Sequence, residues 1–214
     1  MLDQSCAVIA DGEALADAIA RLEREDALAL PWLARDTCAA LIETTRTLPF
    51  RKARSVVGEG DRTVHQDFDI CMPVWAGHPL HRLRQETESV LQTGLATLGQ
   101  AVLPEPLWLN DLVVQRYSPG STGITPHRDH VRYVGLVAIV LLAGDGAFSV
   151  CEDRSGAGDR LVDARPGDLI LMRAPGLFGR RDRPFHQLKS VTRERLTVGL
   201  RHDSTKPPGE ESRS

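Results

Sequence analysis

The spacing of hydrophobic and polar residues changes near the middle of the chain. Before residue 108, apolar side chains recur at helical intervals, which predicts helices over residues 11–30, 36–47 and 79–100. From Trp108 onward, short apolar runs alternate with glycine, proline and aspartate, a pattern typical of β-strands joined by turns. The predicted strands cover residues 112–117, 123–127, 133–142, 147–152, 160–164, 168–172, 186–191 and 195–201.

These patterns predict a mainly β protein with N-terminal helices, of the α+β class. Residues 108–203 are expected to form the β core as a sandwich or barrel. Residues 1–107 are expected to pack on that core as a helical region with a lid in 51–77, where glycines are consistent with a hairpin turn. Residues 204–214 are polar and contain two prolines, which favours a disordered tail.

Composition agrees with one ordinary globular domain. A chain of 214 residues with 42% hydrophobic residues suits a single sizeable core. The net charge of −3 provides no global field for nucleic acid or an acidic membrane, although a local basic patch is still compatible with it. The apolar runs are too short to span a bilayer, and the N-terminus lacks the basic segment of a signal peptide. We therefore expect a cytoplasmic protein.

The four cysteines are scattered and none forms a C-x-x-C pair. This spacing disfavours a zinc ribbon or a thioredoxin-type site. Reduced thiols in a cytosolic protein are the expected state.

Candidate chemistry is concentrated in the β-rich half. His127-Arg128-Asp129 is followed at a distance by His186, at the start of a later predicted strand. Residues two apart in a strand point to the same face, so His127 and Asp129 can reach one ion together. Two imidazoles and one carboxylate occupy one face of an octahedral metal and leave the other positions open, as in non-haem Fe(II) oxygenases. The pattern predicts a metal site formed by His127, Asp129 and His186.

H-x-D alone is a weak signal, and the chain contains a second copy at His65 and Asp67. That copy lies in the mixed N-terminal region, so we expect surface or lid residues there. His78 and His81 have helical spacing but no evident third ligand, and they are expected to be solvated at the start of a helix. The competing interpretation of His127, Asp129 and His186 is a set of hydrogen-bonded polar residues in a β-sandwich.

These residues resemble the Fe(II)- and 2-oxoglutarate-dependent dioxygenases, most closely the AlkB-like branch. That branch carries H-x-D, a distal histidine and the pattern R-x-x-x-x-x-R. In this chain Arg195 and Arg201 match the two arginines of that pattern. Upstream, the run from Gln115 to Gly120 resembles the family pattern N-x-Y-x-P-G, with Gln115 replacing asparagine and Tyr117 matching. The resemblance covers residues 108–202 and implies a double-stranded β-helix, or jelly-roll, core.

The resemblance implies a dioxygenase that uses Fe(II), the cosubstrate 2-oxoglutarate and O2. An arginine would bind the distal carboxylate of 2-oxoglutarate, with Tyr117 as a helper, because a guanidinium matches a carboxylate and stays charged. By parity, Arg193, Arg195 and Arg201 are expected to share one strand face. The spacing from His186 favours Arg195 for this role, and Arg193 is the alternative. The carboxylate ligand Asp129 favours hydroxylation or oxidative demethylation over halogenation.

The substrate has two interpretations. An AlkB-like enzyme would demethylate alkylated nucleic acid or nucleotides, with the arginines before His186 holding phosphates. The candidate arginines are Arg180, Arg181 and Arg183, and the candidate stacking residues are Phe68, Trp75, Tyr133 and Phe178. Alternatively, the enzyme hydroxylates an anionic small molecule or amino acid, which agrees better with 5% aromatic residues and negative net charge. A third hypothesis is a non-catalytic β-sandwich binding module.

Overall fold

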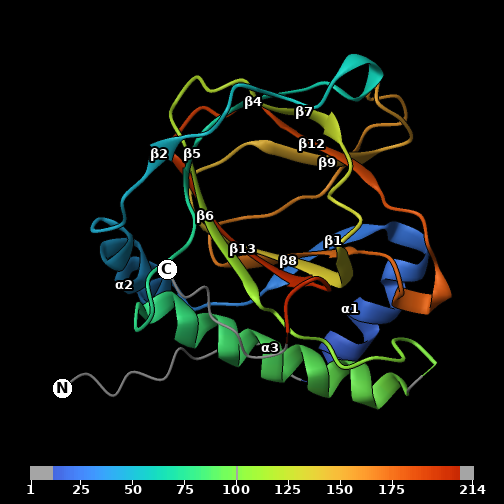
Figure 1. Cartoon of the computed structure of the whole chain (residues 1–214). Helices are drawn as coiled ribbons and strands as arrows, with labels where there is room; N and C mark the ends of the chain where they lie inside the picture. The colour runs from blue at the N-terminus through green and yellow to red at the C-terminus, as the bar shows by residue number, and fades with distance from the viewer. Residues whose placement is uncertain (1–11, 100, 208–214) are drawn as a thin grey trace.

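The computed structural model describes residues 12–99 and 101–207, and their strands form two antiparallel sheets that face each other (Figure 1). The seven-stranded sheet has the order β1-β11-β8-β13-β6-β5-β2. Its strands are β1 (Ala27–Pro31), β2 (Arg51–Lys52), β5 (Asp69–Cys71), β6 (Asp111–Tyr117), β8 (Tyr133–Ala143), β11 (Asp168–Arg173) and β13 (Arg195–Asp203). The six-stranded sheet has the order β10-β9-β12-β7-β4-β3. Its strands are β3 (Val56–Val57), β4 (Val64–Asp67), β7 (Gly123–His127), β9 (Ala147–Cys151), β10 (Arg160–Leu161) and β12 (Phe185–Lys189).

Three α-helices cover the face of the seven-stranded sheet that points away from the other sheet (Figure 1). They are α1 (Gly12–Glu25), α2 (Arg35–Thr45) and α3 (Pro79–Leu98). Short 3-10 turns occur at Gly60–Arg62 and Leu177–Gly179. The mainly β fold with N-terminal helices and a jelly-roll core is therefore confirmed.

The seven-stranded sheet is buried on both faces, which explains its long apolar strands. Leu136, Ala138 and Val140 of β8 pack toward the helices, whereas Val137 packs between the sheets. Because alternate residues of a strand point to opposite faces, one strand supplies both cores. The space between the sheets also contains the polar pocket described below.

The region before residue 108 contains more β-structure than its composition predicts. The helix expected over 11–30 ends at Glu25, and Ala27–Pro31 instead pairs along β11 as β1. The available edge of the large sheet outweighs the helical preference of alanine and leucine there. The hairpin expected within 51–77 is confirmed, because Val56 pairs with His65.

Residues 1–107 are thus not only a helical and lid region, because β2 and β5 extend the large sheet and β4 pairs with β7. The disordered tail was predicted to begin at residue 204, but the described part of it is ordered. Residues 204–207 form a turn in which Lys206 binds Asp111 at 2.8 Å, and 208–214 lie outside the described residues.

The eight strands predicted after Trp108 all occur, the fifth being shortened to Arg160–Leu161. Cys38, Cys71 and Cys151 are free thiols. Within the described ranges no helix is long and apolar enough to cross a membrane. The cytoplasmic location stays a prediction.

A matched pair of leucine substitutions tests the assignment of the core. Leu171 of β11 is 0% exposed, whereas Leu161 of β10 is 59% exposed. We expect Leu171→Ala to lower the free energy of unfolding by about 2–5 kcal/mol, because it leaves a cavity in a buried sheet. Leu161→Ala is expected to change it by less than about 0.5 kcal/mol. Denaturant unfolding measures both, and equal losses would contradict the described packing.

Candidate metal centre

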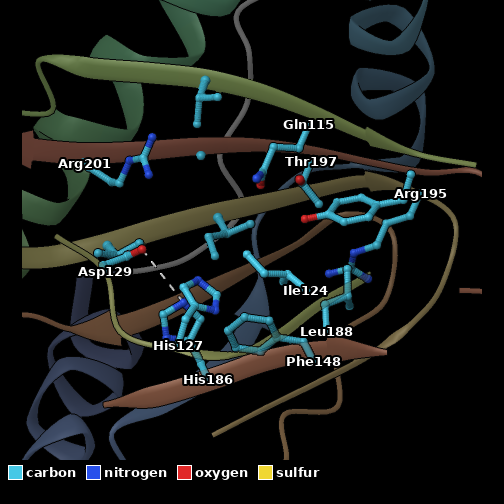
Figure 2. A pocket seen from close by; sticks show the side chains of 15 residues that line it. Gln115, Ile124, His127, Asp129, Phe148, His186, Leu188, Arg195, Thr197 and Arg201 are labelled. Atoms are coloured by element: carbon cyan, nitrogen blue, oxygen red, sulfur yellow. Dashed lines mark ion pairs between the residues drawn. The ribbon is translucent and has the colours of Figure 1, made fainter. Parts of the chain in front are cut away.

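The two histidines meet because β7 and β12 pair antiparallel. His127 is the last residue of β7, and it lies directly opposite His186 in the register. Their ring centroids are 4.2 Å apart. Both side chains point into the space between the sheets, where they line one pocket (Figure 2).

Asp129 completes the group from the loop that follows β7. Its Oδ1 lies 3.9 Å from Nε2 of His186, and one ligand atom from each of the three residues lies within 4.8 Å of the others (Figure 2). Within the described ranges, this is the one group of three or more histidine, cysteine or carboxylate side chains with that proximity. The donor set of two imidazoles and one carboxylate fits a divalent ion such as Fe(II).

Backbone carbonyls orient both imidazoles. Nδ1 of His127 is 3.0 Å from the carbonyl of Thr125, and Nδ1 of His186 is 3.3 Å from that of Pro184. A carbonyl can only accept, so each Nδ1 carries a proton, and Nε2 is the nitrogen of each ring that can bind an ion. This arrangement is the usual one for histidines that bind metals, since the second nitrogen fixes the ring and its tautomer.

The electrostatic surroundings favour the ligating protonation states. Burial lowers the pKa of His127 to about 3, with a further contribution from His186, so its imidazole is neutral near pH 7. Burial opposes ionisation of Asp129, but attraction by His186 and Arg201 outweighs it and lowers the pKa of the carboxyl. A neutral imidazole beside a carboxylate is the form that binds a divalent ion without first losing protons.

Two arginines support the Asp129 side of the group. Arg183 donates to the backbone carbonyl of Asp129 and so fixes the loop. Arg201 lines the pocket, but its guanidinium is paired with the buried carboxylate of Asp111 at 2.9 Å and lies over the ring of Tyr133. Arg201 is therefore held in place by protein groups alone.

Arg195 lies at the other end of the same pocket (Figure 2). It is 2% exposed, and its Nε has no hydrogen-bond partner within the described part of the chain. Tyr117 lies opposite it on β6, and the hydroxyl of Thr197 beside it also lacks a partner. Burial raises the pKa of Tyr117 and lowers that of Arg195. These unpaired donors are suited to an anionic ligand group.

Comparison with a second buried arginine shows that the lack of an ion pair at Arg195 is unusual. Arg173 is also 2% exposed, yet Asp26 and Asp182 each contact its guanidinium at 2.5 Å. In the described residues Arg195 has no such ion pair. A buried charge without a partner is strongly unfavourable, so the pocket favours a bound anion at Arg195.

Arg193 does not share this face, contrary to the parity prediction. Its side chain is 72% exposed, and it pairs with Asp145 at 3.0 Å. Asp145 also accepts hydrogen bonds from the backbone N–H groups of Thr192 and Arg193. These contacts hold the chain in a turn, and β13 begins only at Arg195, so strand parity does not extend to Arg193.

The remaining histidine predictions have mixed outcomes. His65 is exposed on β4 and Asp67 pairs with Lys52 at 2.9 Å, in agreement with surface residues. His78 is not solvated, because it is 3% exposed and caps α3, with Nδ1 accepting from the N–H of Leu80. His81 is half-buried, and its Nε2 lies 3.2 Å from the carbonyl of Val74.

Sequence reasoning missed Thr197 and the apolar wall of the pocket. Thr197 is two residues after Arg195 in β13, so the period of the strand could have identified it. Ile124, Phe148 and Leu188 form the wall opposite the large sheet (Figure 2). They occupy ordinary core positions in the sequence and carry no signal that separates them from other apolar residues.

Comparisons with known proteins give structural matches. No protein-family model matches the chain, and no curated protein matches it. A 2OG-Fe(II) oxygenase-family oxidoreductase from Burkholderia pseudomallei superposes with a TM-score of 0.65 at 15% identity, covering 93% of this chain and 94% of that one. A prolyl-4-hydroxylase from Pseudomonas putida gives 0.61 at 17% identity, covering 88% and 98%. The non-heme alpha-ketoglutarate-dependent epimerase SnoN from nogalamycin biosynthesis gives 0.58 at 21%, covering 95% of each chain.

At these identities the likeness concerns the fold. The chain has the double-stranded β-helix fold of the 2OG-Fe(II) oxygenases over nearly its whole length. No AlkB-like protein is among these three relatives, so that narrower resemblance rests on the motifs alone.

The two H-x-D copies provide a matched test of metal binding. We expect His127→Ala to weaken Fe(II) or Mn(II) binding by at least about 100-fold, because loss of a ligand should exceed the roughly 10–100-fold effect of losing a supporting residue. His65→Ala should bind like the parent. Anaerobic titration calorimetry measures both affinities, and equal affinities for the two variants would exclude the proposed ligand set.

Proposed function

We propose that the protein is an Fe(II)- and 2-oxoglutarate-dependent dioxygenase, with His127, Asp129 and His186 as the iron ligands. The fold, the convergence of the three side chains and the protonation states of His127 and Asp129 support this role. When bound, iron supplies the redox chemistry by which O2 and 2-oxoglutarate oxidise a C–H bond. The overall reaction converts substrate, O2 and 2-oxoglutarate to hydroxylated substrate, succinate and CO2.

The observation that carries the proposal is the buried, unpaired guanidinium of Arg195 in the same pocket as the three ligands. 2-Oxoglutarate has a keto-acid end that can chelate a metal and a carboxylate at its other end. Arg195 would bind that distal carboxylate, with the hydroxyls of Tyr117 and Thr197 as additional donors. Arg201 would act differently, by holding the Asp129 side of the pocket through its pair with Asp111.

The apolar residues of the pocket have a supporting role. Ile124, Phe148 and Leu188 lie between the ligand end and the Arg195 end. By excluding water, they would strengthen the pairing between Arg195 and a carboxylate. Hydroxylation of an N-methyl group gives N–CH2OH, whose N–C bond then breaks to release formaldehyde and leave N–H, so hydroxylation and demethylation need the same protein groups.

For the substrate, we propose an anionic small molecule in preference to alkylated nucleic acid. Three of the four candidate stacking rings pack within the protein: Phe68 against Tyr117, Tyr133 beside Arg201, and Phe178 against the core on the helix side. Trp75 is exposed, but its ring packs against His78, which caps the start of α3. A flipped base would therefore find none of these rings free beside the ligands. AlkB-like demethylation, suggested by the Arg195 and Arg201 spacing, is the alternative.

A pair of arginine substitutions tests the cosubstrate site. Arg195→Gln should weaken 2-oxoglutarate binding to the Mn(II)-loaded protein by roughly 2–5 kcal/mol, because a buried carboxylate loses its partner. Arg193→Gln removes an equal charge outside the pocket and should leave the affinity unchanged. Titration calorimetry distinguishes them, and a loss confined to Arg193→Gln would show that the cosubstrate arginine is misassigned.

Turnover tests the reaction class. With Fe(II), O2 and ascorbate, the parent should release CO2 from the first carbon of isotopically labelled 2-oxoglutarate and form succinate in equal amount. Asp129→Ala should release none above the level of free iron, because the ion loses its carboxylate ligand. Folded parent that binds iron yet releases no CO2 with any of a broad set of small acids and methylated oligonucleotides would contradict a dioxygenase.

A further inference from the structure

Arg173 is a buried arginine at the end of β11 whose guanidinium joins two separate segments of the chain. It is 2% exposed, and its Nε lies 2.5 Å from Oδ1 of Asp26, the residue between α1 and β1. The backbone N–H of Arg173 also donates to the carbonyl of Asp26 at 2.9 Å. One side of this arginine is therefore fixed to the start of β1, which pairs along β11.

The other side of the guanidinium binds Asp182, in the segment that leads to β12. Nη2 of Arg173 lies 2.5 Å from Oδ2 of Asp182, and Nη1 donates to the backbone carbonyl of the same residue at 3.0 Å. Arg180 pairs with the same carboxylate at 3.0 Å and donates to the carbonyl of Glu23 at 2.9 Å. Because both the side chain and the backbone of Asp182 are bound, these contacts fix the position of the residue as well as its charge.

The two residues after this anchored position hold two of the three candidate ligands. Arg183 donates to the backbone carbonyl of Asp129. The carbonyl of Pro184 lies 3.3 Å from Nδ1 of His186. The placement of one short segment therefore affects a carboxylate and an imidazole of the same candidate metal centre.

A small pocket joins this anchor to the metal centre. Arg173, Arg183, Pro184 and Asp129 all line it. Asp129 also lines the large pocket between the sheets, so the anchored segment borders a candidate ligand directly.

Stability alone is a poor explanation for a charged residue at position 173. Replacing a buried ion pair by apolar residues of similar size is often neutral or stabilising, whereas hydrogen bonds of a guanidinium fork specify direction. The side chains of Asp26 and Asp182 are 35% and 51% exposed, so water can solvate both carboxylates without the arginine. Burial opposes ionisation of Asp182, but hydrogen bonds from Arg180 and Arg173 outweigh it and lower its pKa to about 2. The bridge therefore stays charged at neutral pH.

We propose that Arg173 is a positioning residue of the metal centre, which acts through Asp182 to set the segment 182–184 that orients Asp129 and His186. The inference rests on the proposed function, because it takes these two residues as ligands of the ion. It deepens that function by identifying a residue outside the donor set on which metal affinity depends. Arg173 itself binds neither ligand, since its ion pairs in the described part of the chain are with Asp26 and Asp182.

Replacing Arg173 by methionine tests this role, because methionine fills the buried space and makes none of the directed contacts. In folded Arg173→Met protein, the affinity for Mn(II) should fall roughly 10- to 100-fold, the range for losing a group that supports metal ligands. Arg84→Met is the matched control. The side chain of Arg84 is 14% exposed and donates to the carbonyl of Leu109 at 3.2 Å, but it lies on α3 in the helical layer. This variant should bind Mn(II) like the parent even if its free energy of unfolding falls.

A second pair of variants changes exposed positions, where the fold tolerates substitution. Asp182→Ala removes the other partner of the bridge and should also weaken Mn(II) binding. Asp163→Ala removes a carboxylate that is 78% exposed and pairs with Arg165 at 3.8 Å, so it should bind like the parent. This pair decides the question if Arg173→Met does not fold.

A double-mutant cycle tests the route from Arg173 to the ligands. If the arginine acts through segment 182–184, then Arg173→Met and Arg183→Gln should have less than additive effects on the free energy of Mn(II) binding. Arg173→Lys, which keeps the charge without the fork, should recover only part of the affinity. Fully additive effects in the cycle would contradict the proposed route.

The ring N–H groups of the two histidines provide a readout that needs no metal. In histidine-labelled, metal-free protein, nuclear magnetic resonance measures how fast the Nδ1 proton of each ring exchanges with water. Arg173→Met should speed this exchange at His186, which donates to Pro184. It should leave His127 unchanged, because that ring donates to Thr125 on its own strand. Equal acceleration at both rings would indicate general loosening of the fold and would contradict a positioning role.

The outcomes separate this inference from the proposed function. Parent protein that binds Mn(II) and 2-oxoglutarate, with unchanged Mn(II) affinity in folded Arg173→Met and Asp182→Ala, would overturn the inference alone. Folded parent that binds no Mn(II) would overturn the proposed function and this inference with it. An equal loss of affinity in Arg84→Met would assign the effect to stability and so also count against positioning.

Discussion

The pairing of β7 with β12 is the constraint on which the rest of the site depends. It sets His127 opposite His186, and the carbonyls of Thr125 and Pro184 then fix both rings with Nε2 available for an ion. A shift of one residue in this register would turn one imidazole to the outer face of the sheet. Asp129, in the loop after β7, reaches the same point, and Arg183 donates to its backbone carbonyl.

The pocket therefore has two ends with different requirements. At one end, three candidate ligand groups converge, with His127 neutral and Asp129 ionised. At the other end, Arg195 is buried without a carboxylate partner in the described residues, which suits an anionic ligand. A molecule with a chelating end and a distal carboxylate satisfies both requirements at once, and this joint fit is stronger support than either end alone.

The sequence allowed the β-rich half and the three candidate ligands to be predicted, because short periodic runs and the H-x-D spacing are local signals. Other features depend on contacts that are distant in the sequence. Ala27–Pro31 forms a strand because an edge of β11 is available to pair with it. His78 is buried because one ring nitrogen caps α3 and the other contacts the carbonyl of Thr44. Arg193 and Arg195 lie in different surroundings because Asp145 binds the backbone of Thr192 and Arg193 and holds them in a turn before β13.

The central claim is that one pocket holds an iron ion and 2-oxoglutarate together. The most direct measurement is the visible absorption spectrum of the anaerobic protein with Fe(II) and 2-oxoglutarate. The account predicts a weak metal-to-ligand charge-transfer band in the parent that is absent from a folded His186→Ala variant. Absence of the band from folded parent protein, or its persistence in His186→Ala, would contradict the claim and favour a non-catalytic binding module.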